Sequence, residues 1–372
     1  MTTPKVALSK TMALVIAVIV IIGIAISFTL IRPTAPTPIT PTTPTTPTIP
    51  FIRVGTSALG TTGYKIAVFI ADVIARAAEV PANVYPYSRA EIGIKDLCKN
   101  NNEITYISDT QFLDLYAFRG AFEGFQGEVK KMPVQTLWVY TLEVFFLVKA
   151  EDKDKYKSWE DLQGKPVFLT PLGWGAHLHA RRLLGVLGIN VTHVEMSTDK
   201  VVDALRGGTI VAFLGYSASG GVSLPPWIAS AELLIDLAPL NPSADEIRKL
   251  EDAGYGFIEI DAAKLFSRNK GMGKILASPF FFGWGAAIDL PEELVYKVLV
   301  QLEKDAPSLV SVASEFIQVK TDIVGLQVAA VRSLVKSGIP IHPGLAKYLK
   351  EKGAWNPEWD KLVATSLIPV KI

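Results

Sequence analysis

The pattern of apolar and polar positions divides the chain into an apolar N-terminal segment, an uncharged linker and a long region of alternating strand and helix patterns. Residues 12–31 contain no charged side chain. At about 1.5 Å of rise per residue, a helix of this length covers the roughly 30 Å hydrocarbon core of a bilayer. We therefore expect a transmembrane anchor at 12–31. The alternative is a long secretory signal cleaved near Ala25 or Ser27.

The charges around the apolar segment predict its orientation. Lys5, Lys10 and the N-terminal amine precede it, whereas only Arg32 follows it directly. The positive-inside bias then puts residues 1–11 in the cytoplasm and the folded region outside the membrane. We expect a single-pass protein of the cell membrane. The Pro/Thr-rich segment 32–50 contains no glycine, and its prolines favour an extended, semi-rigid linker.

Residue 51 begins a run of strand, loop and helix patterns. A small-residue loop at 55–63 precedes apolar positions from Ile66 to Ala77 that follow the i, i+3, i+4, i+7 spacing of a helix, and Pro81 ends that run. The expected strands here are 51–54, 82–87 and 104–107, with a second helix at 90–99. This βαβ alternation predicts a parallel sheet covered by helices.

A second βαβ region follows the strongly β-prone segment 134–150. Ser158 and Asp161 have capping-box spacing and predict a short helix. The expected strands are 166–169, 189–196 and 210–213, and the expected helices are 178–187 and 199–205. Residues 278–288 form another apolar β run that we interpret as the return crossing between lobes. Helices are expected from Pro291 to about 303, over 312–335, and before Gly353.

The roughly 320 residues beyond the linker suit two domains of ordinary size. We predict an α/β protein with two lobes, each a mainly parallel sheet flanked by helices. Lobe 1 is expected at 51–144 plus 278–372, and lobe 2 at 145–277.

Composition excludes several classes of function. Lys and Arg total 37 against 36 Asp and Glu, and no long basic cluster occurs, so a nucleic-acid partner is not expected. Cys98 is the single cysteine, which excludes an intrachain disulfide and a thiolate metal cluster. His177 and His179 point to different faces of a helix, and no metal-ligand spacing or catalytic motif occurs. We expect no metal, no cofactor and no enzymatic activity.

Two glycine-containing loops at helix starts are the candidate ligand site. The loops at 60–63 and 173–176 would present backbone N–H groups and the positive end of a helix dipole to a small anion. Arg89 follows a predicted strand and could bind a carboxylate with two hydrogen bonds, or could pair with Glu91 on the surface. The candidate cleft walls are Tyr64, Trp174, Tyr216 and Trp284, with core packing as the alternative for Trp284.

Several segments in order resemble the TAXI family of solute-binding proteins, which serve TRAP (tripartite ATP-independent periplasmic) transporters. They include VGTSALGTTGY, SWEDLQGKPVFLTPLGWGAHLHARRLLGVLGI and IPIHPGLAKYLKEKGAW. The resemblance implies a two-lobed type II periplasmic-binding-protein fold and transfer of an organic acid, glutamate or dicarboxylate-like, to membrane permease subunits. This chain departs from the family pattern at Trp174, Ala176 and Val211, and it lacks the second tyrosine beside Tyr64.

Loop positions and resemblance together give the expected ligand-binding residues: Ser57, Thr61, Thr62, Tyr64, Ser88, Arg89, Asp109, Gly173, Trp174, Gly175, Ala176, His177, Tyr216 and Ser217. The alternatives that stay open are a substrate-binding protein of an ATP-driven (ABC) importer and a membrane-anchored ligand sensor. An enzyme relying on Cys98 is a further alternative without a partner base or acid.

Overall fold

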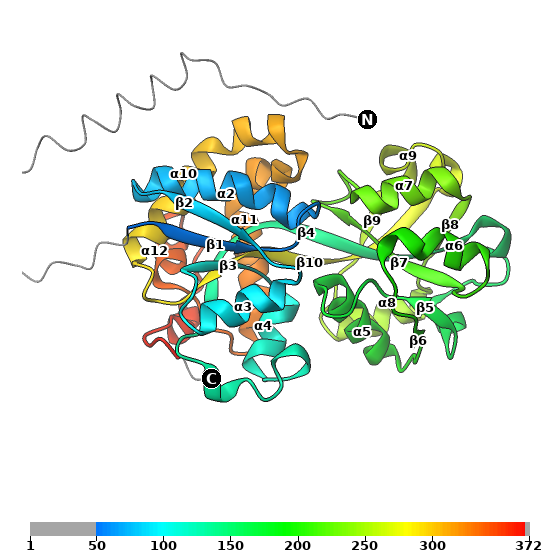
Figure 1. Ribbon diagram of the computed structural model, residues 1–372, viewed down its shortest axis with the longest axis horizontal. Coiled ribbons are helices and arrows are strands. Elements are labelled where there is room, and N and C mark those ends of the chain that lie inside the picture. The colour runs from blue at the N-terminus through cyan, green and yellow to red at the C-terminus, as the bar shows by residue number, and fades with distance from the viewer. Residues whose placement is uncertain (1–49, 369–372) are drawn as a thin grey trace, which may run out of the picture. The chain divides into compact units, whose positions relative to one another are not determined.

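The computed structural model describes residues 50–368 (Figure 1). The predicted anchor at 12–31 and nearly all of the linker at 32–50 lie outside these residues. Within 50–368, no helix combines the length and apolar character needed to cross a bilayer.

The first half of lobe 1 is built from three strands and three helices. They are β1 (Ile52–Thr56), α2 (Thr62–Ala78), β2 (Ala82–Pro86), α3 (Ala90–Cys98), β3 (Ile104–Ser108) and α4 (Asp109–Tyr116). The Thr61 hydroxyl accepts a hydrogen bond from the Tyr64 amide and so caps the start of α2. Ser108 and Gln111 form a full capping box at the start of α4. β1 pairs in parallel with both β2 and β3, which confirms the predicted βαβ arrangement.

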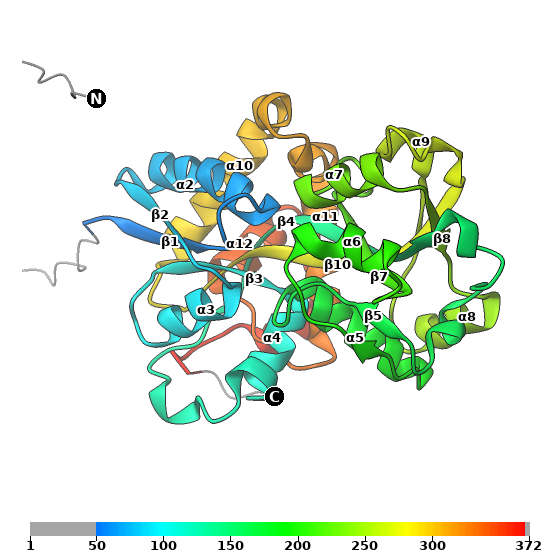
Figure 2. The same ribbon diagram turned by 45° about the vertical axis from the view of Figure 1, so that its right-hand side comes forward.

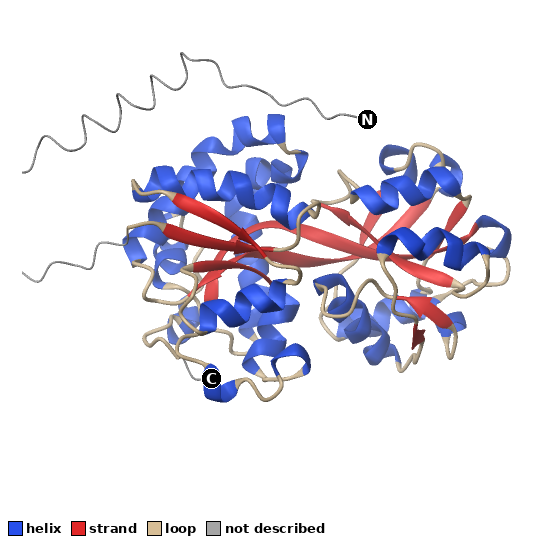
Figure 3. Ribbon diagram, in the orientation of Figure 1, coloured by secondary structure: helices blue, strands red, loops and turns tan. Residues whose placement is uncertain are grey.

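Two long strands cross between the lobes. β4 (Val134–Lys149) and β10 (Lys274–Ala286) pair antiparallel along most of their length. β10 is also antiparallel to β3, and β4 is antiparallel to β7 (Ala212–Ala218). The prediction of mainly parallel sheets was therefore incomplete, because one strand enters lobe 2 and the other returns from it. Figure 3 shows these strands running through both lobes with helices on both faces.

The ten strands within residues 50–368 belong to one mixed sheet. The order is β2-β1-β3-β10-β4-β7-β5-β6, with β8 (Leu237–Leu240) on β4 and β9 (Ile258–Asp261) on β10. β5 (Pro166–Phe168) pairs in parallel with β6 (Thr192–His193) and with β7. The strand expected over 189–196 is only the two-residue β6. The helix expected after Ser158 is a single 3-10 turn, Trp159–Leu162, which keeps the predicted capping box.

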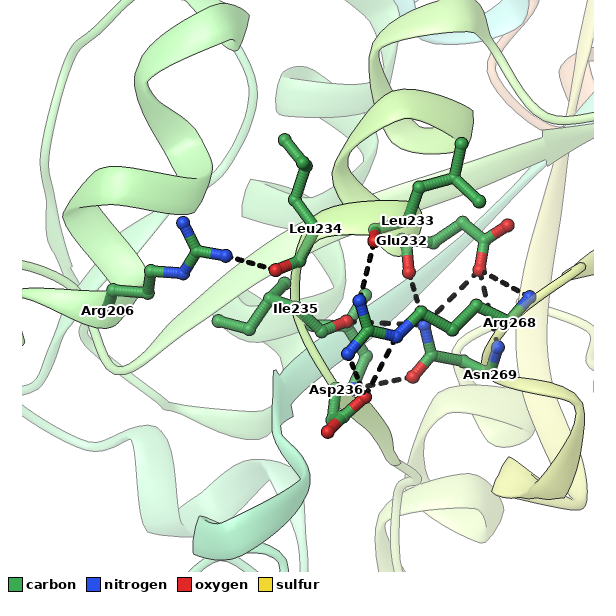
Figure 4. Close-up of polar contacts among 9 residues, drawn as sticks. Arg206, Glu232, Leu233, Leu234, Ile235, Asp236, Arg268 and Asn269 are labelled. Carbon is green, nitrogen blue, oxygen red and sulfur yellow. Dashed lines mark hydrogen bonds and ion pairs between the residues drawn. The ribbon is translucent and has the colours of Figure 1, made fainter.

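The helices of lobe 2 are α5 (Gly175–Leu187), α6 (Val201–Arg206), α7 (Pro226–Leu234), α8 (Ala244–Asp252) and α9 (Ala262–Leu265). The last three lie in a region for which the sequence analysis predicts no helix. Figure 4 shows how the end of α7 is fixed to the segment before β10. The Glu232 carboxylate accepts hydrogen bonds from the amides of Ser267 and Arg268, and Asn269 Nδ2 donates to the Glu232 carbonyl at 2.7 Å. Arg206 donates to the Leu234 carbonyl, so side chains satisfy carbonyls that the helix end leaves free.

Three C-terminal helices cover lobe 1: α10 (Glu292–Val312), α11 (Ile317–Val335) and α12 (Pro343–Glu351). α10 runs past the predicted end near 303 and contains Pro307. The buried Gln327 of α11 bonds both backbone groups of Trp138, accepting from its N–H at 2.8 Å and donating to its carbonyl at 2.7 Å. These bonds satisfy backbone groups of Trp138, which lies beyond the part of β4 that pairs with β7 and beside the register change of β4 and β10 between Phe282 and Gly283.

Candidate ligand site between the lobes

A cavity with about 570 Å³ of atom-free space, part of it open to solvent, lies where the two lobes meet. Ten of the fourteen residues predicted for ligand binding line it: Ser57, Thr61, Thr62, Ser88, Arg89, Gly173, Trp174, Gly175, Ala176 and Tyr216. The lining residues without a prediction are Ala58, Gly63, Ala90, Tyr106, Gln111, Tyr140, Leu142 and Phe282. The two loops that are far apart in the sequence are thus brought to one cavity.

Three helices begin at this cavity. Their N-cap residues are Thr61 for α2, Arg89 for α3 and Trp174 for α5, and all three line it. The first backbone N–H groups of a helix have no partner within the helix, and the helix dipole makes this end positive. α2 and α3 come from lobe 1 and α5 from lobe 2. A small anion in the cavity would therefore be attracted from both lobes.

The charges of the lining residues also favour binding of a small anion. Arg89 is the one cationic side chain that lines the cavity, and no Asp or Glu of the described chain lines it. Arg89 is exposed and forms no ion pair with another described residue. The predicted alternative, a surface pair with Glu91, is not formed, because the Glu91 carboxylate is buried. The guanidinium therefore remains available for a carboxylate or a similar planar anion.

Aromatic rings form the inner wall. Tyr106 of β3 and Tyr140 of β4 share a hydroxyl–hydroxyl hydrogen bond of 2.5 Å. Both rings stack on Phe282 of β10, with centroids 5.0 and 5.7 Å away. Burial raises the pKa of both tyrosines well above the ordinary value, so the phenols stay protonated at neutral pH. This wall gives the cavity an apolar surface for the body of an organic solute.

Glycine in the loops allows the helix starts to lie against these rings. A Cβ at Gly175 would be 2.7 Å from Phe282 Cζ, and one at Gly63 would be 2.8 Å from Tyr106 Cζ. Any larger residue would push the helix N-terminus away from the wall. Gly63 and Gly175 thus fix the depth of the cavity as well as the turn.

Four predicted site residues do not line the cavity, and the side chains of three of them bond elsewhere. Asp109 accepts from the amides of Thr110 and Phe281, and burial raises the pKa of its carboxyl to about 6. The His177 ring bonds the Thr170 carbonyl. Tyr64 and Ser217 also lie outside the lining, and Trp284 is buried core, donating to the Gly55 carbonyl at 3.1 Å. Core packing is thus the correct alternative for Trp284.

Ser217 belongs instead to a buried polar network where the crossing strands meet lobe 2. Its hydroxyl donates to Glu143 at 2.7 Å, and Thr141 and the Gly220 amide donate to the same carboxylate at 2.5 and 2.8 Å. Glu143 is fully buried, and burial raises the pKa of its carboxyl to about 7. Gln318 of α11 bonds the Thr141 amide at 2.8 Å. The network therefore ties β4 to β7 and to a lobe 1 helix.

Two lobes joined by crossing strands, with a cavity between them, define an α/β protein whose candidate ligand site lies at a domain junction. The chain belongs to the NMT1-like family, whose profile matches residues 54–353.

Solved structures with a similar fold come from several bacteria. The MatC protein of Rhodopseudomonas palustris, solved with bound malate, is 12% identical, with 77% of this chain and 97% of that chain covered and a TM-score of 0.47. The periplasmic aliphatic sulphonate binding protein SsuA of Escherichia coli is 15% identical, with 81% and 78% covered and a TM-score of 0.42. The amino acid ABC transporter substrate-binding protein AbpA of Streptococcus pneumoniae, bound to L-arginine, is 13% identical, with 75% and 96% covered and a TM-score of 0.40. At these identities they assign no ligand to this chain.

Proposed function

We propose that this protein is an extracytoplasmic solute-binding receptor that captures a small carboxylated solute between its lobes. One observation carries the proposal: three helix N-termini and Arg89 converge on a cavity whose lining contains no acidic residue. Such a cavity attracts an anion by fixed dipoles and by a guanidinium. The aromatic wall would hold the solute's carbon skeleton. Glutamate and dicarboxylates remain the first candidates.

Capture would proceed by closure of the lobes on the solute. Arg89 and the start of α2 lie on lobe 1, while the loop before α5 lies on lobe 2. A carboxylate that contacts both groups binds the closed arrangement more tightly than an open one, which shifts the population toward closure. A solute that touched one lobe alone would produce no such shift.

The lining residues favour binding over catalysis. The Ser57 hydroxyl bonds Thr61 Oγ1 at 2.7 Å, and none of the described residues that line the cavity is a His, Asp or Glu that could activate either hydroxyl. The Cys98 thiol is buried, and burial raises its pKa to about 12, which suppresses the reactive thiolate. We therefore infer that the protein releases its solute unchanged.

The partner we propose is the membrane permease pair of a TRAP transporter, in keeping with the TAXI resemblance. The proposed anchor at 12–31 would hold the receptor on the outer side of the membrane in which that permease lies. An ABC importer is the second candidate, and a ligand sensor the third. Uptake by proteoliposomes would separate them, since the first needs an ion gradient, the second needs ATP, and a sensor supports neither.

The receptor proposal is tested by thermal unfolding with a panel of organic acids, amino acids and sugars. Binding to the native state raises stability by RT ln(1 + [L]/Kd), or about 2.7 kcal/mol at a concentration of one hundred times Kd. We expect one organic acid to raise the melting temperature. Arg89→Gln should weaken its binding roughly 10- to 100-fold, the scale of a lost charge-assisted hydrogen bond. The matched control is Arg332→Gln, an exposed arginine of lobe 1. No shift with any compound would refute the proposal.

A further inference from the structure

Glu91 is an acidic residue beside the cavity whose carboxyl group is buried without a hydrogen-bond partner among the described residues. It lies in the first turn of α3 on lobe 1, and only 2% of its surface is exposed. Neither carboxyl oxygen has a hydrogen-bond partner among the described residues. Burying an unpaired carboxylate is costly, so such a group requires a partner or a proton.

The other lobe covers this carboxyl. Oε1, Cδ and Oε2 of Glu91 lie 2.8, 3.2 and 3.4 Å from the position that a Cβ on Gly173 would occupy. Gly173 belongs to the lobe 2 turn before α5, and its φ of +86° favours glycine. A larger residue at 173 would collide with the carboxyl. The glycine backbone therefore closes over Glu91 when the lobes meet, and separating the lobes would return the carboxyl to water.

The charged and polar groups around Glu91 do not offset the effect of burial on the pKa of its carboxyl. Arg89 and Lys95 favour the charged form by their positive charge, and the backbone of Glu91 and the side chain of Gln111 on α4 favour it as nearby polar groups, although neither meets hydrogen-bond geometry with the carboxyl oxygens. The lobe 2 segment that covers Glu91, residues 170–175, contains no titratable side chain. Burial outweighs these contributions and raises the pKa of the carboxyl to about 7.

Resting on the proposed solute-binding function, we infer that Glu91 is a proton-binding site formed by closure of the lobes, so that capture of the solute takes up a proton. With the lobes apart, the carboxyl is in water and has its ordinary affinity for protons. With the lobes together, Gly173 excludes water from it. Each closed complex then holds a proton that the open receptor releases.

Proton uptake by Glu91 makes the affinity for the solute depend on pH over a defined range. The closed-state pKa is about 7 against an ordinary value of 4.5, so the closed form binds the proton more tightly. Affinity for the solute should be greatest in acid. It should fall by up to about tenfold per pH unit between 4.5 and 7, and level off above that range.

The experiment is calorimetric titration of the wild-type protein, over this range, with the organic acid found in the thermal panel. Repeating it near pH 6 in buffers of different ionisation enthalpy measures the proton uptake directly. Wild type should take up close to one proton per solute, and Glu91→Gln, which cannot ionise, should take up none and lose the Glu91 part of the slope. Glu91→Ala is the second neutral variant, should Glu91→Gln fail to fold.

Glu79→Gln is the matched control, because Glu79 is exposed at the end of α2, about 25 Å of helix from the cavity. It should keep the wild-type slope and proton count. Proton uptake that persists in both Glu91 variants would overturn the inference, as would wild-type binding without proton uptake. Absence of any binding would instead refute the receptor function itself, so the two failures are distinguishable.

Discussion

Arg182 provides the sharpest test of how the lobes are held together. It lies on α5 of lobe 2, and its Nη2 donates to Asp114 Oδ1 at 2.6 Å and to the Thr110 carbonyl at 3.0 Å. Both acceptors belong to α4 of lobe 1, which Figure 2 shows beside α5. Replacing Arg182 with methionine keeps most of the apolar stem but removes these bonds between the lobes.

The expected loss of stability of the closed arrangement depends on how deeply the Arg182–Asp114 pair is buried and on the partner that Asp114 keeps. The Arg182 and Asp114 side chains are only 16% and 9% exposed, so water screens the pair weakly. Truncating one partner of a buried charge pair costs about 2 to 5 kcal/mol. Asp114 keeps a second partner, Arg119 Nε at 2.7 Å, which argues for the lower end. A loss of about 2 kcal/mol in the closed arrangement weakens solute binding roughly 30-fold.

Isothermal titration with the solute found in the thermal panel measures this loss. Arg181→Met is the matched control, because Arg181 is the neighbouring, exposed arginine on the same helix. It should bind within about threefold of wild type, as expected for a surface substitution. Equal affinities of the Arg182 and Arg181 variants would refute the view that the ion pair stabilises the closed arrangement.

Two further predictions concern stability. Glu143→Ala should lower the free energy of unfolding by about 3 kcal/mol, because the buried donors Thr141, Ser217 and the Gly220 amide lose their acceptor. The control is Glu251→Ala, at an exposed position. Equal urea midpoints for the two variants would contradict this prediction. Burial lowers the pKa of His179 to about 3, against an ordinary value of 6.5. The unfolded chain therefore takes up the proton first, and stability present above pH 6.5 should fall by about 1.4 kcal/mol per unit toward pH 3. His179→Gln should remove that part of the slope in urea unfolding, and an unchanged slope would disprove the assignment.

The candidate site could be predicted where local sequence decides the backbone. Glycine and hydroxyl residues between a strand and a helix indicate a helix N-terminus, and Thr61 and Gly175 lie at such positions. The aromatic wall could not be predicted in this way. Tyr106, Tyr140 and Phe282 come from three strands that meet only through long-range pairing. A possible signal was the aromatic run around Phe282, which equally fits an ordinary buried strand.

The same limit explains the residues that lie outside the cavity. His177 and Ser217 each stand beside a lining residue in the sequence. Successive residues are turned by about 100° on a helix such as α5, and they point to opposite faces on a strand such as β7. Tyr216 therefore lines the cavity while Ser217 bonds Glu143. A surface pair with Glu91 was one alternative for Arg89, but Glu91 is buried, and Gly173 from the other lobe lies against its carboxyl group.

The sequence by itself determined the alternation of strands and helices over much of the chain, the presence of a helix after each of the loops 60–63 and 173–176, and the exclusion of disulfide chemistry with one cysteine. These features depend on neighbouring residues, whose periodicity and capping act locally. Only the tertiary structure decided that β10 returns antiparallel to β4, that three helix starts meet at one cavity, and that Glu91 is covered by Gly173. Those contacts join residues far apart in the chain, and their energy arises from packing and desolvation that no local pattern records.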